Sequence, residues 1–491
     1  MRTMNKARYL AGPAVRARVL VWGELRLLSP ARLGDGDDPV LGHSLLRDPE
    51  SHRPLLTGTT LAGVLRSALA ERRGQVRAEC CWGASQQDAQ GQQSRLIVDD
   101  ALAPETATVD VRTGVALQPE SGTALPHHLY DMELLSTGTT FPIRLEAVLT
   151  GSPTIDTALL EGLVDCCALL EAGDLAVGAG TRRGFGRVGI VAGSLRFWRF
   201  DLSHAAGLAE WLAYGILSEP RSIGQTVPGA AALATALGLD GYSPPPPRSQ
   251  TLSITLHVNN RGSLLIRSPA VPSATEDGTA DHVHLTRHDN GKDVPVLPAT
   301  SLKGVLRAHA RRIAYTLAPG GGRAPQLEES LFGSRDDSRP RAGRVWMDEV
   351  ELEGARTRRH TRVAVSRWTG GALPSRLFTS DAVFGGHATL HWEVRDCQRQ
   401  DLGWMALVLK DWWIDGLVMG GETGTGRGVL GVDMVRLCWQ TPVGAQQWVW
   451  RRPTPEDRGP ETVWEGDLAA LEDAVCVFRQ AVGKTGESCH G

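Results

Sequence analysis

Apolar residues recur every three or four positions in two stretches of the chain, which is the spacing of the buried face of an amphipathic helix. The first stretch follows Thr60, which we interpret as a helix N-cap, and the second follows Ser301. The apolar positions are Leu61, Val64, Leu65, Ala68 and Leu69 in the first stretch and Leu302, Val305, Leu306 and Ala310 in the second. Similar patterns predict further helices over 156–172, 205–240, 398–416 and 465–483.

Runs rich in β-branched and apolar residues predict the strands between these helices. The segments 16–29, with a kink at Gly23, and 251–268 each precede one of the two helices, and strand-like runs fill 95–149 and 344–394. Each half of the chain thus reads strand, loop, helix, strands, helix, glycine-rich loop, strand. That order predicts an α+β fold with an antiparallel sheet and its helices on one face.

The two halves also repeat three blocks of sequence in the same order. The segment PLLTGTTLAGVLR at 54–66 matches PVLPATSLKGVLR at 295–307, and VGAGTRRGFGRVGI at 177–190 matches MGGETGTGRGVLGV at 419–432. A looser pair joins 81–85 and 95–100 to 331–334 and 344–349. The period is far too long for a solenoid, so we interpret the chain as two copies of one domain. The expected organisation is a first domain over 1–200, a helical insertion and Pro-rich linker over 201–250, a second domain over 251–440, and a tail with a helix over 441–491.

Composition narrows the class of protein. A length of 491 residues suits two domains, and 52 basic against 55 acidic residues give no global attraction to nucleic acid. Any nucleic-acid site must therefore be a local basic groove. The eight cysteines form no C-x-x-C pair, which favours free thiols in a reducing cytoplasm over a zinc site or a disulfide scaffold. No apolar run is long enough to predict a membrane span.

The two glycine-rich loops match the spacing of a dinucleotide-binding fingerprint, but that site needs a helix after the loop, and a strand-like run follows here. Two interpretations stay open. The glycines form a tight turn that requires positive φ, or they let an RNA backbone approach the main-chain N–H groups. In the second case the phosphate contacts would come from Arg182, Arg183, Arg187 and Arg427. Glu422, near the position of Gly180, weakens this electrostatic argument for the second loop.

The starts of the two periodic helices are a second candidate RNA-binding region. Thr59, Thr60 and Ser301 place hydroxyl groups where the helix dipole favours anions. Basic charge would come from Arg66, Lys303 and Arg307. Ordinary capping with solvated basic residues is the alternative.

These blocks, taken together, resemble the RAMP superfamily of CRISPR-associated proteins. The resemblance rests on the helix-start motifs ending at Arg66 and Arg307, on Leu331-Phe-Gly-Ser334, and on the two glycine-rich loops. It covers about 16–192 and 251–434 and is greatest for the repeated backbone subunits of type III effector complexes.

The resemblance implies an RRM-like core in each domain and a groove that binds a guide RNA. A β-hairpin called the thumb would come from 105–148 in the first domain and from 356–394 in the second. The second hairpin carries the basic residues Arg356, Arg358, Arg359, His360 and Arg362. The implied partners are the guide RNA, a target RNA and other effector subunits, with no membrane.

The resemblance also implies cleavage of target RNA by an aspartate in the loop between the first strand and the first helix, with Mg²⁺ or another divalent cation. In the second copy this loop is expected over 269–294, and Asp281 is the candidate. In the first copy the candidates are Asp35, Asp37 and Asp38, which a simple Asp/Gly turn also explains. The metal would be held by Asp281 and Asp37.

Three other functions stay open. The chain could be a scaffold that binds the guide without cutting. It could be a guide-processing endoribonuclease that works without metal through His43, His282 or His284. A small-molecule enzyme built on the glycine-rich loops would need a cofactor at those loops.

Overall fold

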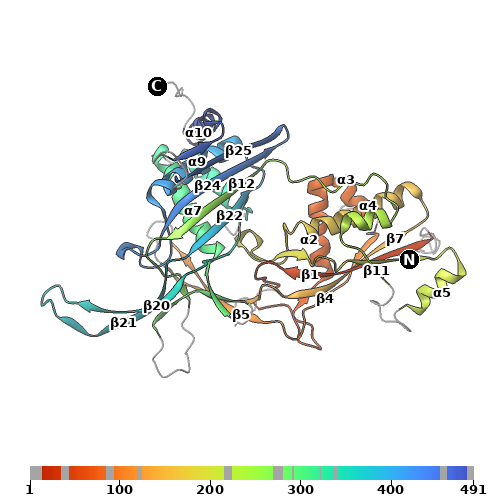
Figure 1. The fold of residues 1–491 in the computed structure, drawn as a ribbon, viewed down its shortest axis with the longest axis horizontal. Coiled ribbons are helices and arrows are strands. Elements are labelled where there is room, and N and C mark those ends of the chain that lie inside the picture. Colours follow the sequence, from red (N-terminus) through yellow and green to blue (C-terminus); the bar gives the residue numbers. More distant parts are fainter. Residues whose placement is uncertain are drawn as a thin grey trace, which may run out of the picture. The chain divides into compact units, whose positions relative to one another are not determined.

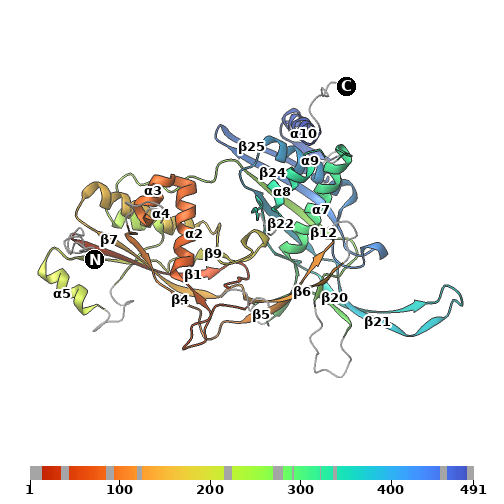
Figure 2. The same cartoon turned by 180° about the vertical axis from the view of Figure 1, so that it is seen from behind.

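The computed structural model describes residues 14–34, 44–83, 93–118, 124–214, 224–268, 280–289, 292–320, 322–334, 340–453 and 462–483. The chain forms two compact units (Figures 1 and 2). Unit 1 comprises Met1–Val111, Met132–Ala179 and Phe185–Pro247, and unit 2 comprises Arg112–Asp131, Gly180–Gly184 and Arg248–Gly491. The division after Pro247 falls at the end of the four-proline run.

The sheet of unit 1 is built around β1 (Ala17–Leu27). One edge of β1 pairs with β7 (Thr140–Leu149), which pairs in turn with β3 (Leu96–Val98). The other edge of β1 pairs with β10 (Arg196–Asp201) along Ala17–Trp22 and with β9 (Arg187–Ile190) along Leu25–Leu27, and all these pairings are antiparallel. Short strands β8 (Leu175–Ala176) and β11 (Gln225–Thr226) extend this side, while β2 (Leu55–Leu56) pairs with β4 (Ala101–Leu102).

The kink expected at Gly23 is absent, because β1 keeps one register with β7 through that residue. Gly23 instead provides space: a Cβ there would lie 3.1 Å from Leu195 Cδ2.

Helices cover one face of this sheet, as the pattern predicted (Figure 1). They are α2 (Gly58–Arg73), α3 (Gln75–Trp82), α4 (Pro153–Glu171) and α6 (Ala230–Ala236). The predicted stripe of α2 is confirmed at Leu61, Leu65 and Leu69, which are buried in one core with β1 and β7. The N-cap is Thr57 rather than Thr60, since the Thr57 side chain accepts a hydrogen bond from the Thr60 N–H.

The segment 205–240 is not one helical region. It contains α5 (Ala205–Ala213), β11 and α6, and α6 contributes Leu233 to the same core as α4. Helix α5 packs on the opposite face of the sheet, where Trp211 and Tyr214 contact Phe200. This second, smaller cluster also includes Leu20 and Trp22 of β1.

Unit 2 repeats the same sheet around β12 (Thr251–Asn260). One edge pairs with β22 (His387–Val394) and then β18 (Val345–Met347), and the other with β24 (Val429–Thr441). Sheet edges are extended by β23 (Leu417–Val418), β25 (Gly444–Arg451) and β26 (Val463–Glu465). The segment set apart as a tail therefore contributes strands to this sheet.

The helices of unit 2 also lie on one face of their sheet. They are α7 (Ala299–Leu317), α8 (Ala324–Phe332), α9 (Arg399–Asp415) and α10 (Leu468–Val482). Helix α7 begins two residues before Ser301, with Pro298 at the N-cap. Trp404 of α9 stacks on Phe478 of α10, with ring centroids 5.0 Å apart, which docks the last helix on the core.

The remaining strands lie between these elements. In unit 2 they are β13 (Ser263–Leu264), β14 (Arg267–Ser268), β15 (His282–His284), β16 (Thr286–Asp289), β17 (Lys292–Leu297), β19 (Val350–Glu351), β20 (Arg356–Val365) and β21 (Ala372–Phe384). The long loop expected at 269–294 is thus wrong for 282–284, 286–289 and 292–294, which pair as strands, and its residues 269–279 and 290–291 lie outside the described residues. A second hairpin, β5 (Val109–Leu117) with β6 (Ala124–Leu135), occupies the expected position of the first thumb.

Both sheets follow one plan. Taken along the chain, β1, β3, β7 and β9 are ordered 2-3-1-4 across the first sheet, and β18-β22-β12-β24 gives the same order in the second. With two helices crossing one face, this is the antiparallel split β-α-β arrangement of ferredoxin-like and RRM-like domains. The predicted α+β class with two tandem ferredoxin-like domains is confirmed.

Candidate nucleic-acid interface

The hairpin of unit 2 formed by β20 and β21 is largely exposed and extends beyond the sheet (Figures 1 and 2). Its strands pair antiparallel from Arg356 with Phe384 to Val365 with Ala372. Trp368 lies in the turn between them and is 89% exposed, and Leu377 is 65% exposed. An exposed aromatic ring beside basic side chains is the combination that stacks on and neutralises single-stranded nucleic acid. The sequence interpretation missed Trp368, although its place between two strand-like runs was a usable signal.

The basic residues predicted on this hairpin differ in their surroundings. Arg358 is exposed, and the described residues offer its guanidinium no hydrogen bond or ion pair. Arg359 forms a bidentate pair with Asp381 across the hairpin, with distances of 2.9 and 3.0 Å. Arg362 is turned toward the glycine-rich loop. Arg358, like the exposed Arg356, is therefore available to an RNA phosphate.

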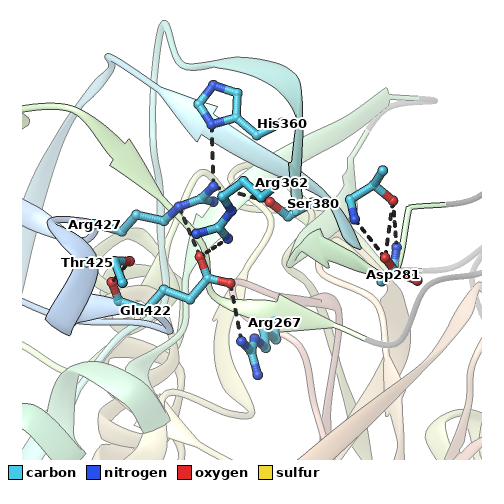
Figure 3. Close-up of polar contacts among 9 residues, drawn as sticks. Arg267, Asp281, His360, Arg362, Ser380, Glu422, Thr425 and Arg427 are labelled. Carbon is cyan, nitrogen blue, oxygen red and sulfur yellow. Dashed lines mark hydrogen bonds and ion pairs between the residues drawn. The ribbon is translucent and has the colours of Figure 1, made fainter. Parts of the chain in front are cut away.

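Asp281 lies at the base of this hairpin, directly before β15 (Figure 3). Its Oδ2 accepts a hydrogen bond of 2.7 Å from the Thr379 N–H and one of 3.4 Å from the Thr379 hydroxyl. The Thr379 hydroxyl is also 3.3 Å from the Asp281 backbone nitrogen, which donates to it. Strand β15 then pairs in parallel with β21, His282 opposite Ser380. The candidate aspartate is thus fixed to the hairpin strand, while Oδ1 has no partner among the described residues.

The glycine-rich loop of unit 2 meets the same hairpin through a cluster of charges (Figure 3). The Glu422 carboxylate pairs with Arg362 of β20, with Arg427 Nε at 3.1 Å and with Arg267 Nη2 at 3.4 Å. Arg427 also donates to Ser380 Oγ at 3.2 Å and lies 3.4 Å from His360 Nδ1. Burial alone would raise the pKa of the Glu422 carboxyl, but the Arg362 hydrogen bond and the three positive charges lower it.

This cluster changes the interpretation of the second glycine-rich loop. Arg427 was a predicted phosphate contact, and its side chain is only 5% exposed and faces Glu422. Burial lowers the pKa of its guanidinium. The exposed part of the loop is 423–426, which carries no basic residue. Two partners of Glu422 were not foreseen, because Arg362 and Arg267 lie 60 and 155 residues away in the sequence.

The glycines of both loops serve the turn itself. A Cβ on Gly186 would lie 1.9 Å from the Val177 carbonyl oxygen, and one on Gly428 would lie 1.9 Å from the Met419 carbonyl oxygen. Both glycines have positive φ, at 76° and 83°. A strand follows each loop, so the context required for dinucleotide binding is absent at both.

The first loop places its three predicted arginines in different surroundings. In unit 2, Arg182 lies over the Trp346 ring, 5.4 Å from its centroid, and burial lowers its pKa. Arg183 beside it is exposed. In unit 1, Arg187 donates through Nε and Nη2 to the Gly173 carbonyl at 3.2 and 2.9 Å, just past the C-terminus of α4. Of the three, Arg183 has the position that suits contact with RNA.

The start of α7 holds Lys303 in a half-buried position within unit 2. Its Nζ donates to the Val345 carbonyl at 2.8 Å and to the Arg182 carbonyl at 3.2 Å. Burial, together with the charges of nearby arginines, lowers the pKa of Lys303 to about 7. Arg307 on the next turn pairs with Glu328 at 2.6 Å. Ser301 is partly exposed, so the hydroxyl remains the accessible group at this helix start.

The corresponding start of α2 is a capping network. The Thr57 and Thr60 hydroxyls lie 2.8 Å apart, and Asp100 accepts a hydrogen bond from the Gly58 N–H at 2.7 Å. Arg66 is partly exposed on the same helix. The capping alternative thus describes Thr60 in this structure, and a contact between Thr60 or Arg66 and RNA stays a prediction.

Asp281 would offer a divalent cation one carboxylate ligand. The described residues contain no group of three or more His, Cys, Asp or Glu side chains that could hold a metal ion. Magnesium is commonly held by one or two carboxylates together with substrate phosphates, so Asp281 fits a cation shared with bound RNA rather than a preformed cage. Asp35, Asp37, Asp38 and His43 lie outside the described residues.

Two ferredoxin-like sheets in tandem, with an exposed basic and aromatic hairpin on the second, are features of a nucleic-acid-binding protein. Comparison with protein families identifies the class more closely: the model of the RAMP superfamily matches residues 24–189 and 260–430. The chain belongs to the RAMP superfamily, whose members are CRISPR-associated RNA-binding proteins. No curated protein matches the chain. Among the described residues, no helix is long and apolar enough to cross a membrane.

Proposed function

We propose that this chain is a guide-RNA-binding backbone subunit of a type III CRISPR effector complex and that it cleaves target RNA complementary to the guide. Membership of the RAMP superfamily through both halves supports RNA binding and assembly with other subunits. The observation that carries the cleavage proposal is the position of Asp281, at the base of the exposed hairpin with Oδ2 bound to Thr379. A strand of RNA lying against that hairpin would pass this carboxylate.

Each residue has a distinct part in the proposed mechanism. Arg358 and Trp368 would bind the RNA along the hairpin, through a phosphate and a base. Thr379 would hold the Asp281 carboxylate in one orientation. A divalent cation held by Asp281 and by RNA phosphate oxygens would stabilise the charge that develops on the scissile phosphate and orient the attacking 2′-hydroxyl.

The second candidate function is a scaffold that binds the guide RNA and does not cut. One specific observation favours it: the Asp281–Thr379 contact already gives the carboxylate a structural role in fixing β15 to β21. Metal-independent cleavage by histidine has less support. Burial lowers the pKa of His284 to about 4, and its Nδ1 accepts a hydrogen bond from the Ile266 N–H.

The test uses the assembled complex, a guide-complementary RNA, and the variants Asp281→Ala and Asp281→Asn. The asparagine variant keeps an oxygen for Thr379 but removes the negative charge. We expect both variants to reduce cleavage at one set of positions at least about a hundredfold, as loss of a transition-state electrostatic contact does. EDTA should stop all cleavage, and guide binding should be unchanged.

Cleavage by Asp281→Asn at the wild-type rate would favour the scaffold function. In the first domain, the double variant Asp37→Ala/Asp38→Ala tests the corresponding carboxylates. Loss of a separate set of cuts there would mean that each domain contributes one nuclease site.

A further inference from the structure

Glu422 has a backbone conformation that its residue type disfavours. It lies in the left-handed region with φ 62° and ψ 29°, at the start of the short η2 turn (Thr423–Thr425). The equivalent residue of the first loop is Gly180, with φ 72° and ψ 18°, and a glycine adopts this conformation without strain. A non-glycine residue persists in such a conformation only where its surroundings determine it, and such residues gather at functional sites.

The side chain of Glu422 explains why the strain is tolerated. Its carboxylate is the acceptor around which Arg267, Arg362 and Arg427 gather. Arg427 is almost fully buried, so removal of the carboxylate would leave its charge without a counterion. Arg362 and Arg427 would then repel each other across the base of the hairpin.

Arg362 and Arg427 connect Glu422 to both strands of the hairpin. Arg362 belongs to β20, and Arg427 bonds to Ser380 of β21 and approaches His360 of β20. Ser380 follows Thr379, whose N–H and hydroxyl donate to the Asp281 carboxylate. Neighbouring residues of β21 are therefore fixed by Glu422 on one side and receive Asp281 on the other.

We propose that Glu422 is a positioning residue: by gathering Arg362 and Arg427 at the base of the β20–β21 hairpin, it holds Thr379 where the Asp281 carboxylate docks. The link to RNA cleavage rests on the proposed function of Asp281. The positional link between Glu422 and Thr379 does not, and the two are tested separately.

The first experiment measures hydrogen exchange in the hairpin of the full-length chain, for wild type, Glu422→Gln and Glu422→Asp. The Thr379 N–H donates to Asp281, so its exchange reports directly on the docked carboxylate. We expect Glu422→Gln to speed exchange at Thr379 about tenfold or more. Glu422→Asp should restore much of the protection, since it keeps the charge and aspartate tolerates the left-handed conformation.

The matched control is Glu353→Gln, which removes an exposed carboxylate of the same unit whose one ion-pair partner among the described residues is His387. It should leave exchange in the hairpin unchanged. Equal protection of Thr379 in wild type and Glu422→Gln would overturn the proposal, and so would equal loss of protection in the Glu353→Gln control.

The second experiment measures cleavage by the assembled complex as magnesium is varied. A displaced Asp281 should raise the half-saturating magnesium concentration of Glu422→Gln about tenfold, with guide binding changed less than about twofold. If Asp281→Ala removes cuts and Glu422→Gln leaves the magnesium dependence unchanged, the positioning role is wrong. If Thr379 loses protection while Asp281→Ala still cuts, Glu422 positions the aspartate and the proposed cleavage function is wrong.

Discussion

The two sheets share one strand order and differ in the face that points away from their helices. In unit 1 the central strand presents Leu20 and Trp22 on that face, where Phe200 and the aromatic residues of α5 cover them. In unit 2 the equivalent positions of β12 are Ser253 and Thr255. The Thr255 hydroxyl lies 3.4 Å from Nδ1 of His391 on the neighbouring strand.

This difference shows that the fold leaves the outer face of each sheet free to diverge. The residues on the helix-facing side are apolar in both copies, since both must form a core. On the outer side, Leu20 and Trp22 of unit 1 pack in the cluster that includes Trp211 of α5, whereas Ser253 and Thr255 take their places in unit 2. Helix α5 comes from the segment that has no counterpart in the second half of the sequence.

Among the variants that test this difference between the two sheets, Phe200→Ala should have the largest effect on stability. Phe200 is fully buried between the sheet and α5, and loss of a buried aromatic side chain typically costs about 3–5 kcal/mol. The equivalent position in unit 2 is Gln440, so Gln440→Ala should cost less than about 0.5 kcal/mol. Urea unfolding, with hydrogen exchange measured separately for peptides of each unit, gives the loss of stability in both variants. Equal destabilisation by the two variants would mean that α5 does not depend on this cluster.

Lowering the pH should reduce the stability of unit 2 through a buried histidine. Burial lowers the pKa of His284 in unit 2 to about 4, against an ordinary value of 6.5. The folded state therefore binds fewer protons than the unfolded state, and the stability present above pH 6.5 falls as the pH drops toward 4. The expected loss is about 1 kcal/mol at pH 5.5 and about 3 kcal/mol in full.

Pulse proteolysis of the full chain between pH 7 and pH 5, with fragments assigned to each unit, measures this loss. The variant His284→Asn keeps an acceptor for the Ile266 N–H and should remove this part of the pH dependence. An unchanged pH profile in that variant would show that another group titrates.

Much of the fold follows from the sequence because it depends on spacing. The stripe of α2 and the strand after each glycine-rich loop depend on residues near in sequence, and both are confirmed. Because the sequence repeats, a pattern found in one half also supports the prediction for the other half. The start of α2 was misplaced because Thr57 and Thr60 are both good caps, and the choice between them depends on the contact of the Gly58 N–H with Asp100, 42 residues away.

The site was less predictable because it depends on contacts between distant segments. Asp281 was expected in a loop, and the strand beside it pairs both with β14 and with β21, about a hundred residues later. Nothing in the sequence distinguishes Arg427 from Arg358. In the structure Arg427 is buried against Glu422, whereas Arg358 is exposed. The sequence reports the residue types, while the partner of each charge is set by the packing of the hairpin.

The smallest expected effects concern the two helix starts, which match closely in backbone and differ in their caps. Thr57 has φ −71° and ψ 141°, and Pro298 has φ −71° and ψ 137°, but only Thr57 has a side chain that accepts an N–H at N3. Thr57→Ala should therefore cost about 1 kcal/mol. Pro298→Thr adds the missing acceptor and gives up the rigidity of proline, so the two contributions of about 1 kcal/mol each should nearly cancel. Urea unfolding of both variants checks this, and a loss above about 1 kcal/mol for Pro298→Thr would show that the second helix start depends on the rigid ring and not on a cap.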